Sequence, residues 1–163
     1  MILKATSKDS NVCIFKCDVS LVESVKEGAQ IARQKFGDVT VLINNAGIVS
    51  GKRLLDNSDF MIKKTLEVNT LALLYTIREF LPAMYRMNKG HIVTISSVSG
   101  IVGAPGMTEY SASKAAAIAI DECVRVEAKK DKKNIKTTCI CPFFINTGMF
   151  EGAKRIGCAP ILD

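Results

Sequence analysis

The sequence predicts an α/β fold in which helices pack against an open parallel sheet. Short apolar, β-branched stretches alternate along the chain with longer stretches of helical periodicity. The short stretches are nearly apolar throughout, which is typical of parallel strands buried on both faces. Polar residues and glycines follow directly after them, where sheets of this kind bind their ligands. A chain of 163 residues suffices for one domain, and we assign residues 1–163 to it.

The first part of the chain is expected to form two strands separated by one helix. Residues 12–16 read as a strand, and residues 39–43 form a continuous apolar strand. Between them, Ser20 and Glu23 have the spacing of a capping box at a helix start. Apolar residues follow at helical spacing, and Gly37 is expected to end the helix.

The second part is expected to add two strands and two long helices. Residues 58–87 predict a helix in two pieces, with Pro82 kinking or restarting it. Residues 91–95 predict a strand, residues 108–130 a helix, and residues 135–141 the last strand.

A serine, a tyrosine and a lysine stand in a pattern that suits proton transfer. Tyr110 and Lys114 are four positions apart on a helix and therefore share one face. An ammonium group beside a phenol favours the phenolate, which lets the tyrosine exchange a proton near neutral pH. Ser97 follows the preceding strand and can hold a substrate oxygen, and Ser96 offers the same chemistry. The plain alternative is a surface helix that carries both residues by chance.

Four further motifs occur in a recognisable order. They are Asp18-Val19, the sequence Asn-Asn-Ala-Gly at residues 44–47, Asn69 within Glu-Val-Asn-Thr, and residues 142–147. Together with the serine, tyrosine and lysine, they resemble the classical short-chain dehydrogenase/reductase family over nearly the whole chain. The sequence of residues 141–152 is most similar to the epidermal retinol dehydrogenase branch of that family.

The resemblance implies a role for each catalytic candidate. Tyr110 would be the acid/base, and Lys114 would lower its pKa and hold the nicotinamide ribose. Ser97 would position the substrate oxygen, and Asn69 would take part in a proton relay through water. A mid-helix asparagine that bends the helix is the alternative for Asn69. The implied reaction interconverts a lipophilic alcohol and carbonyl, such as retinol and retinal, with NAD as cofactor and NADP equally open.

The resemblance also implies cofactor contacts outside the catalytic group. Asp18 and Val19 would line the adenine pocket, although a helix-capping aspartate explains Asp18 as well. The contacts toward the rest of the cofactor would come from Asn45, Ala46, Gly47, Tyr110, Lys114, Pro142, Ile145 and Thr147. An ordinary turn is the alternative for residues 45–47. Phe143 departs from the glycine that usually follows the proline in this family.

No glycine-rich dinucleotide turn occurs in the sequence. By resemblance, the chain enters at the family's third strand. The expected fold is therefore a partial Rossmann-like, doubly wound parallel sheet lacking the first two strands, a single incomplete domain of the family. The residue that selects NAD or NADP would lie in the missing segment. A second hypothesis follows: a catalytically silent truncated fragment that pairs with a full-length homologue.

Composition narrows the possible partners. The net charge is +6, with a lysine cluster at positions 129, 130, 132 and 133 that reads as a solvated helix end or as an attraction to anionic membrane surfaces. We expect no nucleic-acid partner and, because the six cysteines lack zinc-like spacing, no metal. The resemblance implies a homo- or hetero-dimer through helices 58–87 and 108–130. It also implies the endoplasmic reticulum membrane or lipid droplet surface, or the cytosol if this unanchored chain exists alone.

Overall fold

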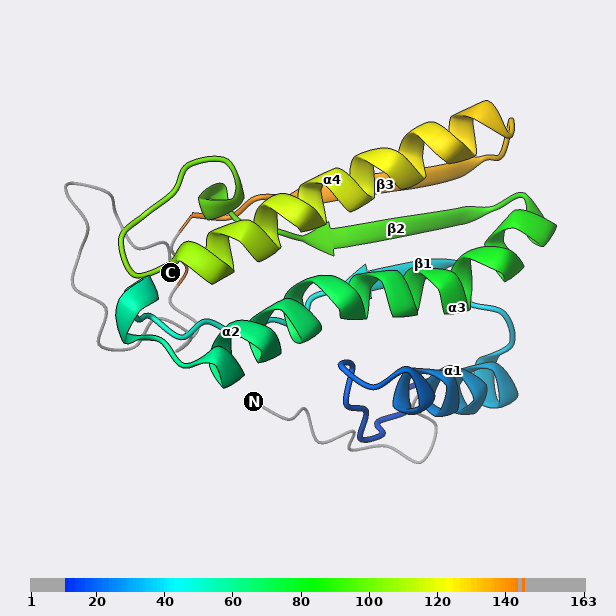
Figure 1. Ribbon diagram of the computed structural model, residues 1–163. Coiled ribbons are helices and arrows are strands. Elements are labelled where there is room, and N and C mark those ends of the chain that lie inside the picture. Colours follow the sequence, from blue (N-terminus) through cyan, green and yellow to red (C-terminus); the bar gives the residue numbers. More distant parts are fainter. Residues whose placement is uncertain (1–10, 144, 146–163) are drawn as a thin grey trace.

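The computed structural model describes residues 11–143 and 145. Its centre is a parallel sheet of three strands in the order β1-β2-β3, with β1 at Val41–Asn44, β2 at Gly90–Ile95 and β3 at Ile135–Ile140. Val41 pairs with His91, and Gly90 pairs with Ile135, so all carboxyl ends meet at one edge (Figure 1). The predicted parallel α/β fold is confirmed, with strand boundaries shifted by one or two residues.

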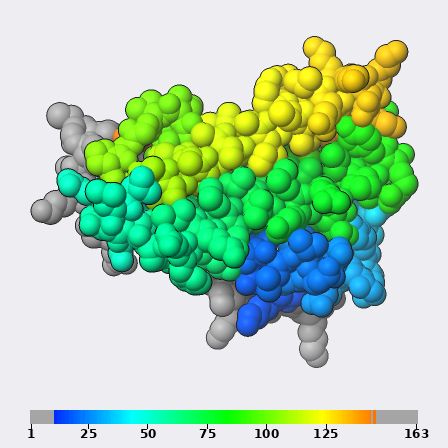
Figure 2. Space-filling view, viewed as in Figure 1, coloured from blue at the N-terminus to red at the C-terminus, as the bar shows by residue number. Residues whose placement is uncertain are grey.

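The helices form a layer against one face of this sheet. They are α1 (Val22–Phe36), α2 (Asp59–Leu66), the π-helical turn η2 (Glu67–Leu71), α3 (Ala72–Met87) and α4 (Thr108–Lys130), with short 3-10 turns η1 (Leu54–Asp56) and η3 (Val98–Gly100). Helix α3 lies between α1 and α4 (Figures 1 and 2). The sequence led us to expect helices on both faces of the sheet. In the described part of the chain, however, Val41, Ile43 and Ile140 on the strands are exposed, and helices cover only one face. None of the described helices has the length and apolar character that a membrane span requires.

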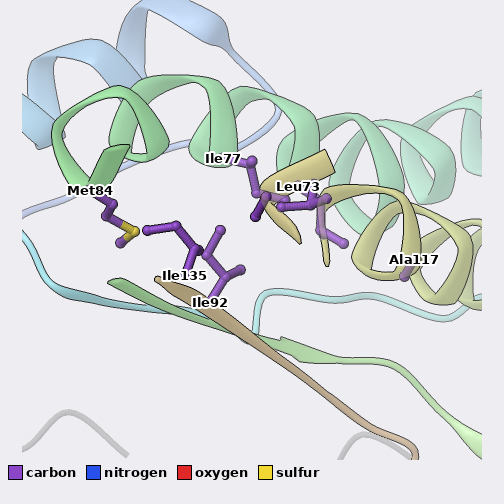
Figure 3. Close-up of a cluster of buried hydrophobic side chains, with 8 residues drawn as sticks. Leu73, Ile77, Met84, Ile92, Ala117 and Ile135 are labelled. Atoms are coloured by element: carbon purple, nitrogen blue, oxygen red, sulfur yellow. The ribbon is translucent and has the colours of Figure 1, made fainter. Parts of the chain in front are cut away.

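The core lies between α3, α4 and the sheet. Leu73, Ile77 and Met84 of α3 point toward Ile92 and Ile135 on the strands (Figure 3). Met84 is fully buried, and a Cβ atom placed on Gly90 would come within 2.6 Å of its sulfur. Only glycine therefore fits at the start of β2. This contact fixes the end of α3 against the strand that leads to the site.

The predicted strand at residues 12–16 is wrong, because this segment is irregular in the structure. It packs instead along α1, where Lys35 Nζ donates to the Val12 carbonyl at 3.2 Å and the Phe15 ring lies against Gly28. A strand requires a neighbour that shares its backbone hydrogen bonds. Among the described residues only β2 pairs with β1, so the outer edge of β1 is bare in this part of the chain.

The predicted capping role of Ser20 is also wrong. Helix α1 begins after Leu21 without a side-chain cap. The Ser20 hydroxyl donates to Asp18 Oδ1 at 2.6 Å, and the Ser24 hydroxyl accepts from the Asp18 amide at 2.9 Å. Asp18 therefore organises the turn before the helix. The predicted end of the helix at Gly37 is confirmed. The φ of this residue is +79°, a backbone conformation that glycine adopts more readily than other residues.

The long helix at residues 58–87 is broken, but not at the proline. Ser58 caps α2 by accepting from the Met61 amide at 3.2 Å. Pro82 lies inside α3, which continues through it. The interruption is the π-helical turn η2 around Asn69. The carboxamide of Asn69 bonds to groups outside the helix, which explains why the irregularity occurs there rather than at Pro82.

Candidate active site

A cavity of about 130 Å³ lies at the carboxyl ends of the three strands. Its walls come from the segments that follow each strand and from the first turns of α4. The lining residues are Asn45, Gly47, Ile95, Ser96, Ser97, Tyr110, Lys114, Pro142, Phe143 and Ile145. The cavity thus brings together most of the residues that the sequence placed in separate segments.

The start of α4 presents the tyrosine and the lysine to this cavity. Both side chains are buried, with Tyr110 4% and Lys114 5% exposed. The Lys114 ammonium lies 5.7 Å from the centroid of the Tyr110 ring and donates to the Ile95 carbonyl at 2.8 Å. The end of β2 therefore fixes the cation beside the phenol.

The connection from β2 to α4 is held tightly against the helix. A Cβ atom on Gly100 would come within 2.7 Å of the Lys114 carbonyl carbon, so the backbones approach at a distance that only glycine permits. The Ser96 hydroxyl donates to the Lys114 carbonyl oxygen at 2.8 Å. Ser96 thus uses its proton to anchor the loop. Of the two serines, it is Ser97 whose hydroxyl forms a hydrogen bond with the Tyr110 side chain.

Burial governs the electrostatics of the tyrosine and the lysine. Burial raises the pKa of Tyr110, and the hydrogen bond with Ser97 opposes that increase. Burial also lowers the pKa of Lys114, with the nearby Cys139 and Cys141 opposing the shift. The net shift for the phenol is opposite to the one expected from an adjacent ammonium. The physical reason is that desolvation of the buried phenol outweighs every other influence on its pKa.

Asn69 links the π-helical turn to helix α4. Its side chain is fully buried; Oδ1 accepts from the Ile48 amide at 2.8 Å, and Nδ2 donates to the Ile48 carbonyl at 2.9 Å. Nδ2 also donates to the Ser113 hydroxyl at 3.0 Å, which in turn donates to the Tyr110 carbonyl at 2.6 Å. The sequence analysis missed Ser113. Its position three residues after Tyr110, on the same helix face, was the available signal.

Other predicted cofactor contacts lie apart from the cavity or outside the described residues. Asp18 and Val19 do not line the cavity; the Asp18 carboxylate accepts from Ser20, and this hydrogen bond lowers its pKa. Ala46 is exposed and does not line the cavity either. Thr147 lies outside the described residues. The roles predicted for these four residues remain predictions.

Within residues 11–143 and 145, no group of three or more His, Cys, Asp or Glu side chains is placed so that it could hold a metal ion. His91 Nε2 is 2.8 Å from the Thr138 hydroxyl on the neighbouring strand. The sulfur atoms of Cys139 and Cys141 are 4.0 Å apart. Burial of Cys139 is the largest of the causes that raise its pKa to about 12.

Comparison with known proteins agrees with this geometry. The family model described as short chain dehydrogenase matches residues 2–155. Human epidermal retinol dehydrogenase 2 is 47% identical over 154 residues, covering 94% of this chain and 50% of that protein. Retinol dehydrogenase 10-B of Danio rerio is 47% identical over 144 residues, covering 88% of this chain and 43% of that protein. The chain thus spans about half the length of the curated relatives it matches.

Solved structures share the fold as well. An alcohol dehydrogenase from the archaeon Thermococcus sibiricus, complexed with 5-hydroxy-NADP, superposes with a TM-score of 0.75 at 29% identity. The match covers 81% of this chain and 54% of that one. The family match over residues 2–155, the identity to these relatives and the fold together establish that the chain belongs to the short-chain dehydrogenase family.

Proposed function

We propose that this chain is part of an NAD(P)-dependent oxidoreductase that interconverts a lipophilic alcohol and its carbonyl, with retinol and retinal as the substrate class. The observation that carries this proposal is the convergence of Ser97, Tyr110 and Lys114 on one cavity at the strand ends. The substrate class is supported by the names of the relatives, which are retinol dehydrogenases. Phe143, which lines the cavity, adds an apolar wall.

The chemistry assigned to the chain is a proton transfer at the Tyr110 oxygen. In carbonyl reduction the phenol gives its proton to the substrate oxygen, and in alcohol oxidation the phenolate takes it back. The Ser97 hydroxyl, bonded to that phenol, holds the substrate oxygen in reach. Because burial raises the pKa of Tyr110, it favours the protonated phenol, which is the form that acts as the donor.

Lys114 and Asn69 support this transfer from two sides. The buried ammonium of Lys114 lies beside the tyrosine ring and within the cavity wall, where it can also contact a cofactor ribose. Asn69 holds its turn against Ile48 and, through Ser113, against the backbone of Tyr110. Its participation in a proton relay through water is part of the proposal. Its hydrogen bonds support at least a positioning role.

The cavity fits the nicotinamide end of a cofactor. Its volume of about 130 Å³ suits one aromatic ring, and hydroxyl and ammonium groups line it. Gly47 lies close to the lysine, since a Cβ atom there would be in ordinary contact with Lys114 Nζ at 3.5 Å. When bound, the nicotinamide supplies or accepts the hydride. The residues proposed to hold the cofactor are Asp18, Val19, Asn45, Ala46, Gly47, Tyr110, Lys114, Pro142, Ile145 and Thr147.

NAD is the proposed cofactor, and NADP is the competing choice. The archaeal alcohol dehydrogenase structure carries an NADP derivative, which shows that the shared fold accommodates the phosphorylated form. Fluorescence titration of a protein of the relatives' full length that contains this chain, with NADH and NADPH in parallel, compares the two directly. Tighter binding of NADPH would overturn the choice of NAD.

A dimer through α3 and α4 is the proposed assembly. A groove of about 630 Å³ runs between these helices and has a largely apolar lining of Leu74, Ile77, Arg78, Leu81, Pro82, Tyr85, Ala119, Ile120, Cys123, Val124 and Glu127. Such a groove is suited to a second helix pair. The partner is a second copy of the chain or a full-length homologue. Sedimentation equilibrium of wild type and Leu74→Asp tests this assembly, which predicts a dimer that the substitution dissociates.

A lipid surface, at the endoplasmic reticulum membrane or a lipid droplet, is the proposed location. A lipophilic substrate partitions into lipid, and the basic cluster of Lys129, Lys130, Lys132 and Lys133 favours anionic surfaces. Flotation with anionic liposomes at low and at physiological salt is the test. Binding that is absent even at low salt would contradict a contribution from the lysines.

The function itself is tested by retinal formation. A protein of the relatives' full length that contains this chain is incubated with retinol and NAD, and retinal is measured by chromatography. We expect Ser97→Ala to lower turnover at least about 100-fold, the size typical for the loss of one hydrogen-bond donor to the reacting oxygen. Ser99→Ala is the matched control, because Ser99 is adjacent but does not line the cavity. Equal losses in both variants would contradict the role of Ser97.

A further inference from the structure

A partly buried hydrogen bond joins the loop after β1 to the first turn of α4. The Ser50 hydroxyl donates to Oε1 of Glu109, a side chain that is only 4% exposed. The same hydroxyl oxygen accepts from Asn57 Nδ2 at 3.0 Å and from the Lys52 amide at 3.3 Å. Ser50 is therefore the common anchor for both ends of the segment 51–57, of which residues 51–56 are exposed.

This hydrogen bond lies directly beside the cavity. Ser50 follows the cavity-lining Gly47 in the same loop, and Glu109 immediately precedes Tyr110. The two segments also lie near each other at Gly106, where a Cβ atom would lie 3.4 Å from the Gly51 carbonyl oxygen. The two walls of the cavity that carry Gly47 and Tyr110 are thus tied together outside the catalytic group itself.

We propose that Glu109 is a positioning residue, which latches segment 51–57 through Ser50 and so holds the tyrosine wall of the cavity against the glycine wall. We call Ser50 and Glu109 the latch. Glu109 does not line the cavity, so it acts through the loop and through the helix turn that carries Tyr110. The inference deepens the function proposed above and rests on it only where turnover is measured.

The chemistry of the latch predicts unequal effects for its two members. Glu109 Oε2 has no hydrogen-bond partner among the described residues, so Ser50 is the hydroxyl on which the buried carboxyl depends. Ser50→Ala leaves that carboxyl buried without it, which is the costly way to break such a bond. Glu109→Gln keeps an amide oxygen that still accepts from Ser50. Ser50→Ala is therefore expected to open the loop more than Glu109→Gln.

Trypsin measures this opening on the chain as it exists. Lys52 and Arg53 are exposed cleavage sites inside the latched segment, and Lys136 within β3 reports unfolding of the sheet. Where reclosing is fast, cleavage follows the population of the open form. We expect Ser50→Ala to raise cleavage at positions 52 and 53 about tenfold, the factor that one hydrogen bond to a buried carboxyl contributes. Cleavage at Lys136 is expected to stay unchanged.

A mutant cycle and a matched control complete the test. The double variant Ser50→Ala/Glu109→Gln is expected to cleave no faster than Ser50→Ala alone, because the two residues share one interaction. Glu122→Gln is the control, since Glu122 is an exposed residue of α4 that bonds to Arg125. Unchanged cleavage at positions 52 and 53 in Ser50→Ala would overturn the latch. A parallel increase at Lys136 would overturn it too, because the pair would then support the fold as a whole.

Turnover in the full-length protein separates the latch from the proposed function. Ser50→Ala is expected to lower kcat/KM for retinol about tenfold, whereas Glu109→Gln, which keeps an acceptor for Ser50, is expected to retain most of the wild-type value. If Ser50→Ala is cleaved as predicted but the wild type makes no retinal, the proposed function is refuted and the latch stands. Wild-type turnover with normal kcat/KM in Ser50→Ala would refute the positioning role instead.

Discussion

Asn69 is predicted to be among the most costly polar residues to replace in the described part of the chain. Asn69→Leu keeps nearly the same volume but removes the hydrogen bonds to the Ile48 amide, the Ile48 carbonyl and the Ser113 hydroxyl. The site is fully buried, so water does not replace the lost partners. The π-helical turn around Asn69 then loses the contacts that hold it open.

The expected loss of stability follows from these contacts. Each intramolecular hydrogen bond contributes about 1 kcal/mol net, and a buried polar group left without a partner costs about 1–3 kcal/mol. The three lost bonds therefore predict a decrease of about 3 kcal/mol in the free energy of unfolding. Domains of this size are stable by only about 5–15 kcal/mol, so the change is large enough to measure.

Urea unfolding followed by far-UV circular dichroism is the assay, with the midpoint and slope fitted for each variant. Asn134→Leu is the matched control, because Asn134 is exposed and its side chain makes none of the hydrogen bonds described for Asn69. We expect the control to stay within about 0.5 kcal/mol of wild type. A loss below about 1 kcal/mol for Asn69→Leu would refute the view that its carboxamide holds the turn.

Three further predictions follow from the same structure. Gly100→Ala places a Cβ atom 2.7 Å from the Lys114 carbonyl carbon, so we expect a loss of about 1–3 kcal/mol in urea unfolding. Ser113→Ala removes the bridge between Asn69 and the Tyr110 carbonyl and is expected to cost about 2 kcal/mol; a loss within error would contradict the bridge. The pKa of Cys139 is raised to about 12, so at pH 8 its thiol stays protonated. Its alkylation, followed by mass spectrometry, is expected to be slower in the folded chain than in urea, and to accelerate as the pH rises toward that pKa.

The longest elements were predictable because their signals are periodic. The helix expected at residues 108–130 is α4 as found, and the strands β1, β2 and β3 lie within two residues of their expected positions. The segment at residues 12–16 has an equally apolar pattern but no neighbour among the described strands. Local pattern alone cannot supply a pairing partner, which is why that expectation failed.

The interruption of the long helix shows a second limit of predicting structure from the local sequence. Proline is the strongest local signal for a break, yet α3 continues through Pro82. The π-helical turn forms around Asn69 because its carboxamide bonds to Ile48 and Ser113, which are 21 and 44 positions away. Contacts at such separations depend on the tertiary structure and leave no mark on the local sequence.

The site was predicted in part. Family motifs located Ser97, Tyr110 and Lys114, and the structure brings them to one cavity. Ser113 and Glu109 were missed, because serine and glutamate on a helix usually face solvent and only the packed fold shows these two buried. The direction of the Tyr110 pKa shift was also missed, since the degree of burial is a property of the folded chain.

The measurement that tests the central claim most directly is the effect of Tyr110→Phe in a protein of the relatives' full length. In the proposed reaction the phenol oxygen carries the proton, whereas the ring is packed in the wall of the cavity. Retinal formation is therefore expected to fall below detection, while the Kd for the cofactor, measured by fluorescence titration, stays within about twofold. Turnover within severalfold of wild type would show that another group transfers the proton.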